Sequence, residues 1–274
     1  MGWLSKIESP WLTRRLIAIW KLFASDLDLS EAKHLEFRSL QDCFIRELKD
    51  GVRPIDYREG ILVSPCDAIV GACGQMEGNQ LFQAKGFPYP LEDLIPDPRM
   101  QKRYRNGTYV TLRLKSSMYH RFHAPVDCKV CTVTYISGDT WNVNPIALER
   151  IEKLYCKNER AVVELEPDTG SEHEAILMVP VAAILVASMK FHCVDQPLDL
   201  KYKGPNLIPC AARYRKGEEM GYFQHGSTII VFAPSTYQLE KNIAPGTRIN
   251  MGEPLLKKGT LRDEITPFPA VQSG

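Results

Sequence analysis

The sequence has no apolar run long enough to cross a membrane, because a spanning helix needs roughly 20 consecutive apolar residues and no stretch of the 274 residues approaches that length. A secretory signal is not expected either, since its apolar centre would be residues 16–20, which are too few and are followed by Lys21. Excess charge of one sign is also lacking, with 34 Lys and Arg against 33 Asp and Glu. We therefore expect no nucleic-acid partner, and any charged ligand has to meet a local patch.

Spacings typical of disulfide frameworks or metal sites are absent. The chain has eight cysteines, but they are scattered, and Cys128 and Cys131 form a single CxxC pair inside a strand-like run. His120 and His123 form an HxxH pair, with no Cys, Asp or Glu at a distance that would complete a zinc site. We expect reduced thiols, as in a cytosolic protein, and no bound metal.

The composition is that of a folded protein. Hydrophobic residues make up 44% and charged residues 24%, so the chain can bury a core. No low-complexity segment or linker divides the sequence after residue 50. We therefore predict two parts: residues 1–50 as a helical, membrane-associating segment and residues 51–274 as one β-rich domain.

An amphipathic helix is predicted at residues 11–24 (WLTRRLIAIWKLFA). Its apolar side chains recur at helical spacing, at Leu12, Leu16, Ile19, Trp20 and Phe23. Arg14 and Lys21 lie on another face. Two interpretations remain open: the helix packs on the main domain, or it lies in the head-group region of a membrane with its Trp, Arg and Lys side chains as anchors.

A second helical segment is predicted at residues 30–49. Ser30 is a suitable N-cap ahead of Glu31, and the run SLQDCFIREL carries apolar residues at helical spacing. The helices are expected to end near Gly51.

After Pro54 the sequence changes to short runs rich in Val, Ile, Thr and Tyr, broken by Gly, Pro, Asn and Asp. These runs are ILVSP, TYVTLRL, KVCTVTYI, RAVVELE, AILMVPVAAILVASM and STIIVFAP. The most apolar run, residues 174–189, is β-branched and contains Pro180, which favours buried strands over a membrane helix. We therefore predict an α+β fold whose body is mainly antiparallel β.

A short internal repeat accompanies these strands. Residues 64–70 (SPCDAIV) and 124–130 (APVDCKV) share the pattern P-x-D-x-x-V, each at a turn that leads into a strand. Such a pair suggests a β core with repeated hairpin units.

A candidate nucleophile stands at the entrance of the last apolar strand, in Gly226-Ser227-Thr228. In isolation this tripeptide is typical of a turn. A Gly carbonyl beside a Ser hydroxyl in a strained turn also meets the needs of an N-to-O acyl shift, because Gly adds no bulk and tolerates unusual backbone angles. Such chemistry needs a base and a group that orients the base. Asp67, His120 and His123 are candidates, although singly Asp67 is more typical of a turn.

Seven segments in order resemble the phosphatidylserine decarboxylase family. They are FIRELKDGVRPI at 44–55, SPCD at 64–67, QAKG at 83–86, YHRFHAP at 119–125, NVN at 142–144, NER at 158–160 and GYFQHGST at 221–228. About two-thirds of the chain takes part, and several segments in the same order are far more specific than any one motif.

The resemblance implies a self-processing triad of Asp67, His123 and Ser227. Asp67 would orient His123, which takes the Ser227 proton as the hydroxyl attacks the Gly226 carbonyl. The ester that results would eliminate, which cleaves the chain between 226 and 227, frees the Gly226 carboxylate and leaves a dehydroalanine. Addition of water and loss of ammonia would convert this residue into a pyruvoyl group derived from Ser227. This group is the only cofactor implied.

The implied reaction is decarboxylation of phosphatidylserine to phosphatidylethanolamine and CO₂ in phospholipid biosynthesis, with the pyruvoyl carbonyl as electron sink. His120 resembles the family's second histidine and is assigned to the decarboxylation step as a proton donor. The resemblance also implies a peripheral enzyme on the cytoplasmic face of the inner membrane, whose two cleaved chains stay together. A homodimer is left open.

The chain departs from the family pattern at four positions, His225, Ala68, Ser116 and Met118, where most relatives carry Leu, Gly, Pro and Asp. Three alternatives therefore remain: a pyruvoyl-dependent decarboxylase of a different amine, a lipid-binding relative that never cleaves, and a serine hydrolase. The hydrolase is disfavoured because the sequence has no G-x-S-x-G motif.

Overall fold

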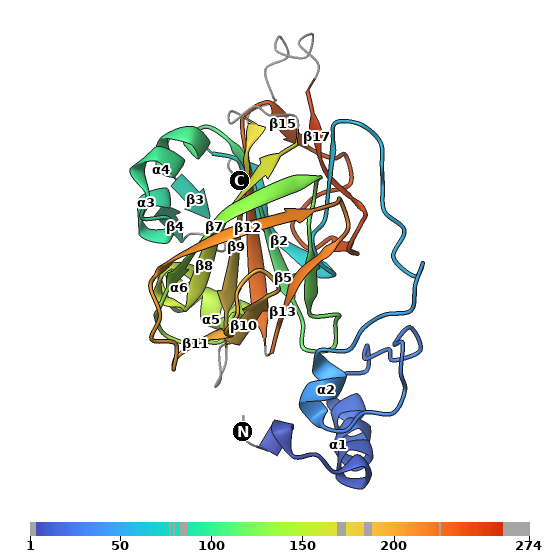
Figure 1. Cartoon of the computed structure of the whole chain (residues 1–274). Coiled ribbons are helices and arrows are strands. Elements are labelled where there is room, and N and C mark those ends of the chain that lie inside the picture. The colour runs from blue at the N-terminus through green and yellow to red at the C-terminus, as the bar shows by residue number, and fades with distance from the viewer. Residues whose placement is uncertain are drawn as a thin grey trace.

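The computed structural model describes residues 4–76, 78, 80–82, 87–168, 174–183, 188–224 and 226–259. Figure 1 shows a β body with an N-terminal helical unit at one end, and the predicted α+β class is confirmed. Within the described part of the chain, no helix combines the length and the apolar character that crossing a membrane requires. The segment 83–86 and His225 lie outside the described residues.

The first predicted helix is confirmed as α1 (Pro10–Phe23), which follows a 3₁₀ turn, η1 (Leu4–Lys6). Pro10 begins the helix, where its missing N–H costs nothing. Together with α2 (Leu40–Phe44), α1 encloses a small core separate from that of the β body. The buried members of this core are Leu27, Leu29, Ala32, Phe37 and Cys43.

The second predicted helix is wrong over most of its length. Only Leu40–Phe44 is helical, and its N-cap is Ser39, whose hydroxyl accepts the Asp42 N–H at 3.1 Å. The residues around Ala32 pair instead with those around Leu48 in an antiparallel bridge, which has one backbone hydrogen bond of 2.9 Å on each side. This pairing requires extended backbone, so tertiary contacts override the local helical pattern.

The large sheet has eight antiparallel strands in the order β12-β7-β8-β9-β14-β5-β2-β16. In sequence order they are β2 (Ala68–Gln75), β5 (Thr108–Leu114), β7 (Cys128–Ile136), β8 (Arg160–Pro167), β9 (Ile176–Ala182), β12 (Leu207–Tyr214), β14 (Ser227–Ala233) and β16 (Arg248–Ile249). The apolar runs predicted as strands form β5, β7, β8, β9 and β14 here. The two central strands, β9 and β14, are buried along their whole length.

Three smaller sheets surround it. A four-stranded sheet has the order β11 (Leu198–Asp199), β10 (Ser188–Phe191), β13 (Glu219–Phe223), β6 (Arg121–His123). A three-stranded sheet contains β1 (Ile61–Val63), β17 (Pro254–Lys258) and β15 (Tyr237–Leu239), and β3 (Gln80–Phe82) pairs with β4 (Pro88–Pro90). The remaining helices are α3 (Leu91–Leu94), α4 (Pro98–Tyr104), α5 (Pro145–Leu148) and α6 (Leu154–Lys157).

Each face of the large sheet buries a core. Alternate strand residues point to opposite faces, so Val163 and Ile229 pack with the four-stranded sheet while Val162 and Ile230 pack with the helices. Phe122, Phe191 and Phe223 of the four-stranded sheet form edge-to-face ring contacts over the first face. Ser227 lies two residues before Ile229 on the same strand, so its side chain is on the same face. It therefore points into the space between the two sheets.

The two sequence repeats lead into equivalent strands. Residues 64–67 precede β2 and residues 124–127 precede β7, and each strand is second from an edge of the large sheet. Both strands have a register irregularity at the same interval, between Val70 and Cys73 and between Val130 and Val133. The β core therefore contains the repeated unit that the short sequence match suggests.

Candidate active site

Ser227 is the first residue of β14, in the middle of the large sheet. It is paired with Leu114 on β5 and with Ala182 on β9. Its side chain is fully buried, and the hydroxyl oxygen has no hydrogen-bond partner within the described residues. A buried hydroxyl without a partner is unfavourable, so its presence calls for a functional reason.

The carbonyl before Ser227 is held by the neighbouring strand. The Ala183 N–H donates to the Gly226 carbonyl at 2.9 Å, which continues the β9–β14 ladder one residue past Ala182. Side chains stand roughly perpendicular to a sheet, so the Ser227 hydroxyl stands out from the plane that contains this carbonyl. The peptide that an acyl shift would break is thus fixed beside a free nucleophile.

Asp67 lies in the turn before β2 and is nearly fully buried. Its carboxylate accepts hydrogen bonds from two nitrogens of Arg53, with shortest distances of 2.9 Å from Nε and 2.7 Å from Nη2. It also accepts the Met251 backbone N–H at 2.9 Å, while Arg53 makes a further ion pair with Glu31 at 2.8 Å. Asp67 is therefore fixed between the N-terminal segment and the C-terminal strands.

His123, at the end of β6, is buried and held at both ring nitrogens. Nδ1 lies 2.9 Å from the Gly217 carbonyl and Nε2 lies 3.0 Å from the Tyr119 hydroxyl. A carbonyl only accepts, so Nδ1 carries the hydrogen and Nε2 keeps its lone pair. Burial lowers the pKa of His123, although the Gly217 hydrogen bond opposes this. A neutral ring that keeps a lone pair on Nε2 is what a general base needs.

The predicted hydrogen bond between Asp67 and His123 is not formed in this structure. Each residue has other partners, although the Asp67 charge is near enough to raise the pKa of His123 somewhat against the effect of burial. No hydrogen bond within the described residues joins Ser227 to His123. The structure thus brings Asp67 and His123 into one region, with Ser227 outside hydrogen-bond reach, and the triad roles stay a prediction.

Gly217 supplies the carbonyl that orients His123, and sequence analysis did not identify it. Its φ is +82°, in the left-handed region that favours glycine, and an added Cβ would lie 2.8 Å from Ile55. Tyr119, the second partner of His123, lies in the YHRFHAP segment but had no role assigned. The sequence of a tight turn does not indicate which distant side chain will form a hydrogen bond with the carbonyl of that turn.

His120 is fully buried and connects the helical unit to the segment before the cleavage site. Its Nδ1 lies 2.9 Å from the Met118 carbonyl, and its ring contacts Phe44 of α2, with centroids 3.8 Å apart. Its own carbonyl accepts the Phe223 N–H at 2.9 Å, four residues before Ser227. Met118, a departure from the family pattern, thus uses its backbone to hold His120.

An apolar cavity of about 170 Å³ lies where the helical unit meets the β body. It is lined by Ser5, Trp20, Leu40, Gln41, Phe44 and Gln224. Phe44 forms one wall and also contacts His120, and Gln224 is three residues before Ser227. The cavity is therefore lined both by the helical unit and by the segment that precedes the candidate cleavage site.

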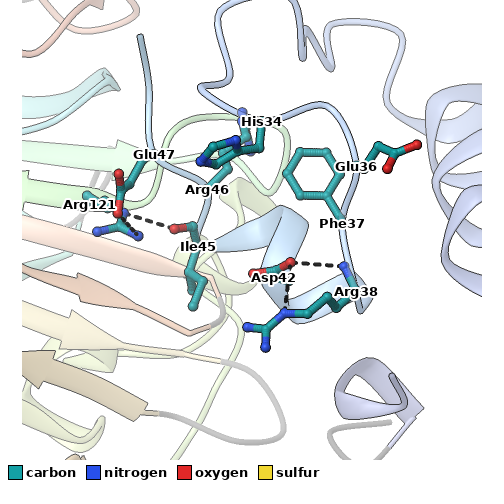
Figure 2. Close-up of a pocket in the computed structure, with 9 residues that line it drawn as sticks. All are labelled: His34, Glu36, Phe37, Arg38, Asp42, Ile45, Arg46, Glu47 and Arg121. Atoms are coloured by element: carbon teal, nitrogen blue, oxygen red, sulfur yellow. Dashed lines mark hydrogen bonds and ion pairs between the residues drawn. The ribbon is translucent and has the colours of Figure 1, made fainter. Parts of the chain in front are cut away.

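Two further cavities are more polar, and both are lined by Glu47. Figure 2 shows the first, of about 340 Å³, lined by His34, Glu36, Phe37, Arg38, Asp42, Ile45, Arg46, Glu47 and Arg121. In it Arg121 donates to the Ile45 carbonyl at 2.9 Å. The second, of about 320 Å³, is lined by His123 and Tyr119 among others.

Two further buried polar residues contact Ala182, the partner of Ser227 on β9. The Asn158 amide donates to the Ala182 carbonyl at 3.0 Å, and neither carboxylate oxygen of Glu159 has a hydrogen-bond partner within the described residues. Burial, together with the charge of Asp199, raises the pKa of Glu159 to about 8. Both residues belong to the NER segment of the sequence, but their position could not be deduced from it.

Metal-binding groups do not gather anywhere in the described residues: no three His, Cys, Asp or Glu side chains are placed to hold an ion. All eight cysteines lie in the described part of the chain and carry free thiols.

Comparison with known proteins defines the class of this fold and site. The family model described as phosphatidylserine decarboxylase matches residues 40–257, a span that includes Asp67, His123 and Ser227. The chain belongs to the phosphatidylserine decarboxylase family.

Individual relatives support this assignment over nearly the whole chain. A phosphatidylserine decarboxylase proenzyme from Anaeromyxobacter sp. (strain K) is 35% identical over 266 residues, which cover 93% of this chain and 91% of the relative. Proteins of the same name from Vibrio cholerae serotype O1 (strain ATCC 39541) and Aliivibrio salmonicida are similar, at 33% identity over 265 residues and 31% over 264 residues. These matches cover 93% and 92% of this chain and 91% and 90% of the two relatives.

Proposed function

We propose that this chain is a proenzyme that cleaves itself between Gly226 and Ser227 and then decarboxylates phosphatidylserine to phosphatidylethanolamine and CO₂. Family membership and the proenzyme names of its relatives support this function. The observation that carries the proposal is the Ser227 hydroxyl, which is buried beside the Gly226 carbonyl without a hydrogen-bond partner in the described residues.

The cleavage begins when His123 takes the proton of the Ser227 hydroxyl. The neutral ring presents its Nε2 lone pair for this purpose because Nδ1–H is bound to Gly217. Nε2 has to exchange its Tyr119 partner for Ser227, and Asp67 stabilises the ring once it is charged. The oxygen attacks the Gly226 carbonyl carbon, the C–N bond breaks, and the nitrogen takes the proton from His123, which leaves an ester.

The residues around Ser227 suit a pyruvoyl group at this position. Ser227 is fully buried and its neighbour on β9 is the small Ala182, so the position is closed to solvent and has no large side chain beside it on that strand. Once formed, this group supplies a carbonyl that condenses with the substrate amine and withdraws electrons from the bond that breaks. His120, fixed through Nδ1 by Met118, provides the proton of the decarboxylation step.

The N-terminal helix gives the enzyme access to lipid. Large apolar side chains of α1 are exposed at Trp11, Ile19, Leu22 and Phe23, on the side opposite the residues that pack inward, Thr13, Ile17 and Trp20. Such a face suits docking in the head-group region of the cytoplasmic face of the inner membrane. The apolar cavity beside Phe44 then receives part of the lipid.

A denaturing gel with mass spectrometry tests the cleavage. Wild-type chain should give two fragments of roughly 26 and 5 kDa, and the small fragment should be lighter by one ammonia than a peptide that begins with serine. The Ser227→Ala variant should stay as one band of about 31 kDa. The exposed Ser235→Ala variant is the matched control and should cleave normally. A single wild-type band would favour the non-cleaving relative instead.

The substrate is tested separately, with the cleaved enzyme and phosphatidylserine in mixed micelles. The expected result is release of CO₂ and formation of phosphatidylethanolamine. Conversion of a soluble amino acid while phosphatidylserine stays unchanged would support the alternative decarboxylase. His120→Ala should cleave normally but turn over more slowly, and failure to cleave would contradict the separate role given to His120.

A further inference from the structure

One peptide group connects a buried asparagine to the carbonyl of Gly226. The Ala183 N–H of this group donates to Gly226 at 2.9 Å, and the Ala182 C=O of the same group accepts Asn158 Nδ2–H at 3.0 Å. The peptide unit is conjugated, so a hydrogen bond at its oxygen draws electron density from its nitrogen and strengthens the N–H as a donor. Asn158 thus acts on Gly226 through a chain of two hydrogen bonds.

Asn158 is held rigidly enough for this role. It is fully buried, its amide nitrogen also donates to the Trp141 carbonyl at 2.8 Å, and its amide oxygen accepts the Trp141 N–H at 2.9 Å. These contacts define which end of the amide is nitrogen. The Ala182 N–H is fixed as well, by the Glu159 carbonyl at 2.8 Å.

The side chain takes the place of a strand neighbour. β8 begins only at Arg160, and the N–H of Glu159, the residue opposite Ala182, donates to the Asp139 carbonyl at 2.9 Å instead. The Ala182 carbonyl therefore receives a side-chain donor where a ladder would otherwise supply a backbone N–H. A backbone donor at the Ala182 carbonyl would complete the same chain of hydrogen bonds, but it would offer no side chain that can be changed by mutation.

On the basis of the proposed self-cleavage, we propose that the Ala183 N–H stabilises the negative charge that develops on the Gly226 oxygen, and that Asn158 is the positioning residue for this donor. When the Ser227 oxygen bonds to the Gly226 carbon, the carbonyl electron pair moves to the Gly226 oxygen. A hydrogen bond to an oxyanion is about twice as strong as one to a neutral carbonyl. The Ala183 N–H thus favours the tetrahedral state before the C–N bond breaks and the nitrogen takes the proton.

The first measurement is the rate of cleavage of pulse-labelled chain, followed on a denaturing gel. Loss of one oxyanion donor slows catalysis by roughly 10²–10³-fold, and a donor that stays in place but loses its support should cost less. We expect Asn158→Asp and Asn158→Ala to cleave about tenfold more slowly than wild type. The two variants complement each other. Asn158→Asp keeps an oxygen that can accept the Trp141 N–H, and Asn158→Ala removes the donor without adding a charge.

The matched control is Asn144→Ala. Asn144 lies in the same connection between β7 and β8 and caps α5 by accepting the Ala147 N–H at 2.8 Å, but it has no bond to Ala182. Loosening this connection without touching Ala182 should leave the cleavage rate unchanged. Equal slowing by Asn144→Ala and Asn158→Ala would mean that Asn158 only anchors the connection, and would overturn the proposal.

The second measurement reads the Gly226 carbonyl directly and needs no cleavage. In the Ser227→Ala precursor, alanine follows glycine at only two places, after Gly71 and after Gly226. Labelling glycine carbonyls with ¹³C and alanine nitrogens with ¹⁵N therefore gives two carbonyl–amide cross-peaks in an HNCO spectrum. Asn158→Asp and Asn158→Ala in this background should move the Gly226 carbonyl resonance upfield, as a weaker hydrogen bond does, while the Gly71 resonance stays in place.

The proposal requires both effects together. Slower cleavage with an unmoved Gly226 resonance, or a moved resonance with cleavage at the wild-type rate, overturns it. Absence of cleavage in the wild type would instead overturn the proposed function, and the spectrum of the Ser227→Ala precursor would still report whether Asn158 acts on Gly226.

Discussion

The ion pair of Arg53 and Asp67 is almost fully enclosed, with 10% and 3% of the two side chains exposed. Removal of one partner from such a pair leaves a buried charge uncompensated, which costs roughly 3–5 kcal/mol. We expect Arg53→Ala to lower the free energy of unfolding by about this amount, measured by urea denaturation in the uncleaved Ser227→Ala background.

The matched control is Arg58→Ala, because Arg58 makes an equally short ion pair with Asp56 but is 67% exposed. Exposed ion pairs contribute little to stability because water screens them, so this variant should unfold nearly as wild type does. Equal losses in the two variants would show that burial of the Asp67 pair does not matter for stability.

Glu159 should make stability depend on pH. Burial raises its pKa from 4.5 to about 8 in the folded chain. Between these values the unfolded chain has lost the Glu159 proton while the folded chain keeps it, so the unfolded state binds fewer protons and stability falls as pH rises. The contribution is fully present below pH 4.5 and is lost as pH increases through about 8.

The test is urea unfolding from pH 5 to 8 in the Ser227→Ala background. Glu159→Gln should flatten this part of the stability profile and should be more stable than its parent near pH 8. Glu149→Gln, at an exposed position, should leave the profile unchanged. An unaltered slope in Glu159→Gln would mean that this carboxyl ionises normally in the folded chain.

The sequence indicates residue types better than residue partners. Asp67, His120, His123 and Ser227 could be singled out because they lie in segments that resemble one family. The contacts of Asp67 with Arg53 and Met251 join residues far apart in the chain, one of them 184 residues away. Such contacts depend on strand order, which local patterns do not reveal.

At the scale of the element, prediction succeeded where side-chain pattern and burial agree. β5 and β14 are runs rich in β-branched and apolar residues in the sequence and lie side by side in the sheet, paired residue for residue from Thr108–Ala233 to Leu114–Ser227. The helix predicted for residues 30–49 is wrong because the apolar side chains of this segment fill a compact core between extended segments. They do not line one face of a helix. Periodicity reports which residues are buried, and only tertiary contacts decide how the backbone buries them.

The exposed face of α1 predicts membrane binding that is separate from cleavage. Trp11, Leu22 and Phe23 are 69%, 81% and 86% exposed and lie within 120° of one another around the helix axis. Changing all three to Ser should reduce binding to vesicles that contain phosphatidylserine by at least about tenfold, because insertion of large apolar side chains drives such binding. Flotation of the vesicles measures it.

A double variant on the β body, Leu200→Ser with Leu207→Ser, is the control, since both residues are exposed and apolar but lie far along the chain from α1. It should bind vesicles as wild type does. Both variants should still cleave at Gly226. Equal loss of binding in the two would show that general surface hydrophobicity, and not the α1 face, holds the protein on the vesicle.

At the scale of the whole molecule, the large sheet consists of two similar halves that meet at the candidate cleavage site. One half is β7-β8-β9 and the other is β2-β5-β14, with β9 and β14 paired at the centre. Ala182 and Ser227 are partners across this central pair. The seam between two repeated units thus places a side chain from one half, Asn158, behind the peptide that contacts the cleaved carbonyl of the other.

This architecture predicts that cleavage will not separate the two chains. The C-terminal fragment begins with β14, which pairs with β5 on one side and β9 on the other, and its later strands β16 and β17 pair with β2 and β1. Each large apolar side chain of β14 is fully buried and contributes about 1.5–3 kcal/mol of hydrophobic stabilisation. Cutting the bond before Ser227 removes none of these contacts.

The cleaved protein should therefore elute from a sizing column in native buffer as a species that contains both fragments, at the same volume as the uncleaved Ser227→Ala chain. In concentrated urea the fragments should elute apart. After removal of the urea the uncleaved chain should recover its fold more completely, because its two parts remain covalently linked and need no bimolecular encounter. Elution of the small fragment alone in native buffer would show that the paired strands around β14 do not hold the cleaved chains together.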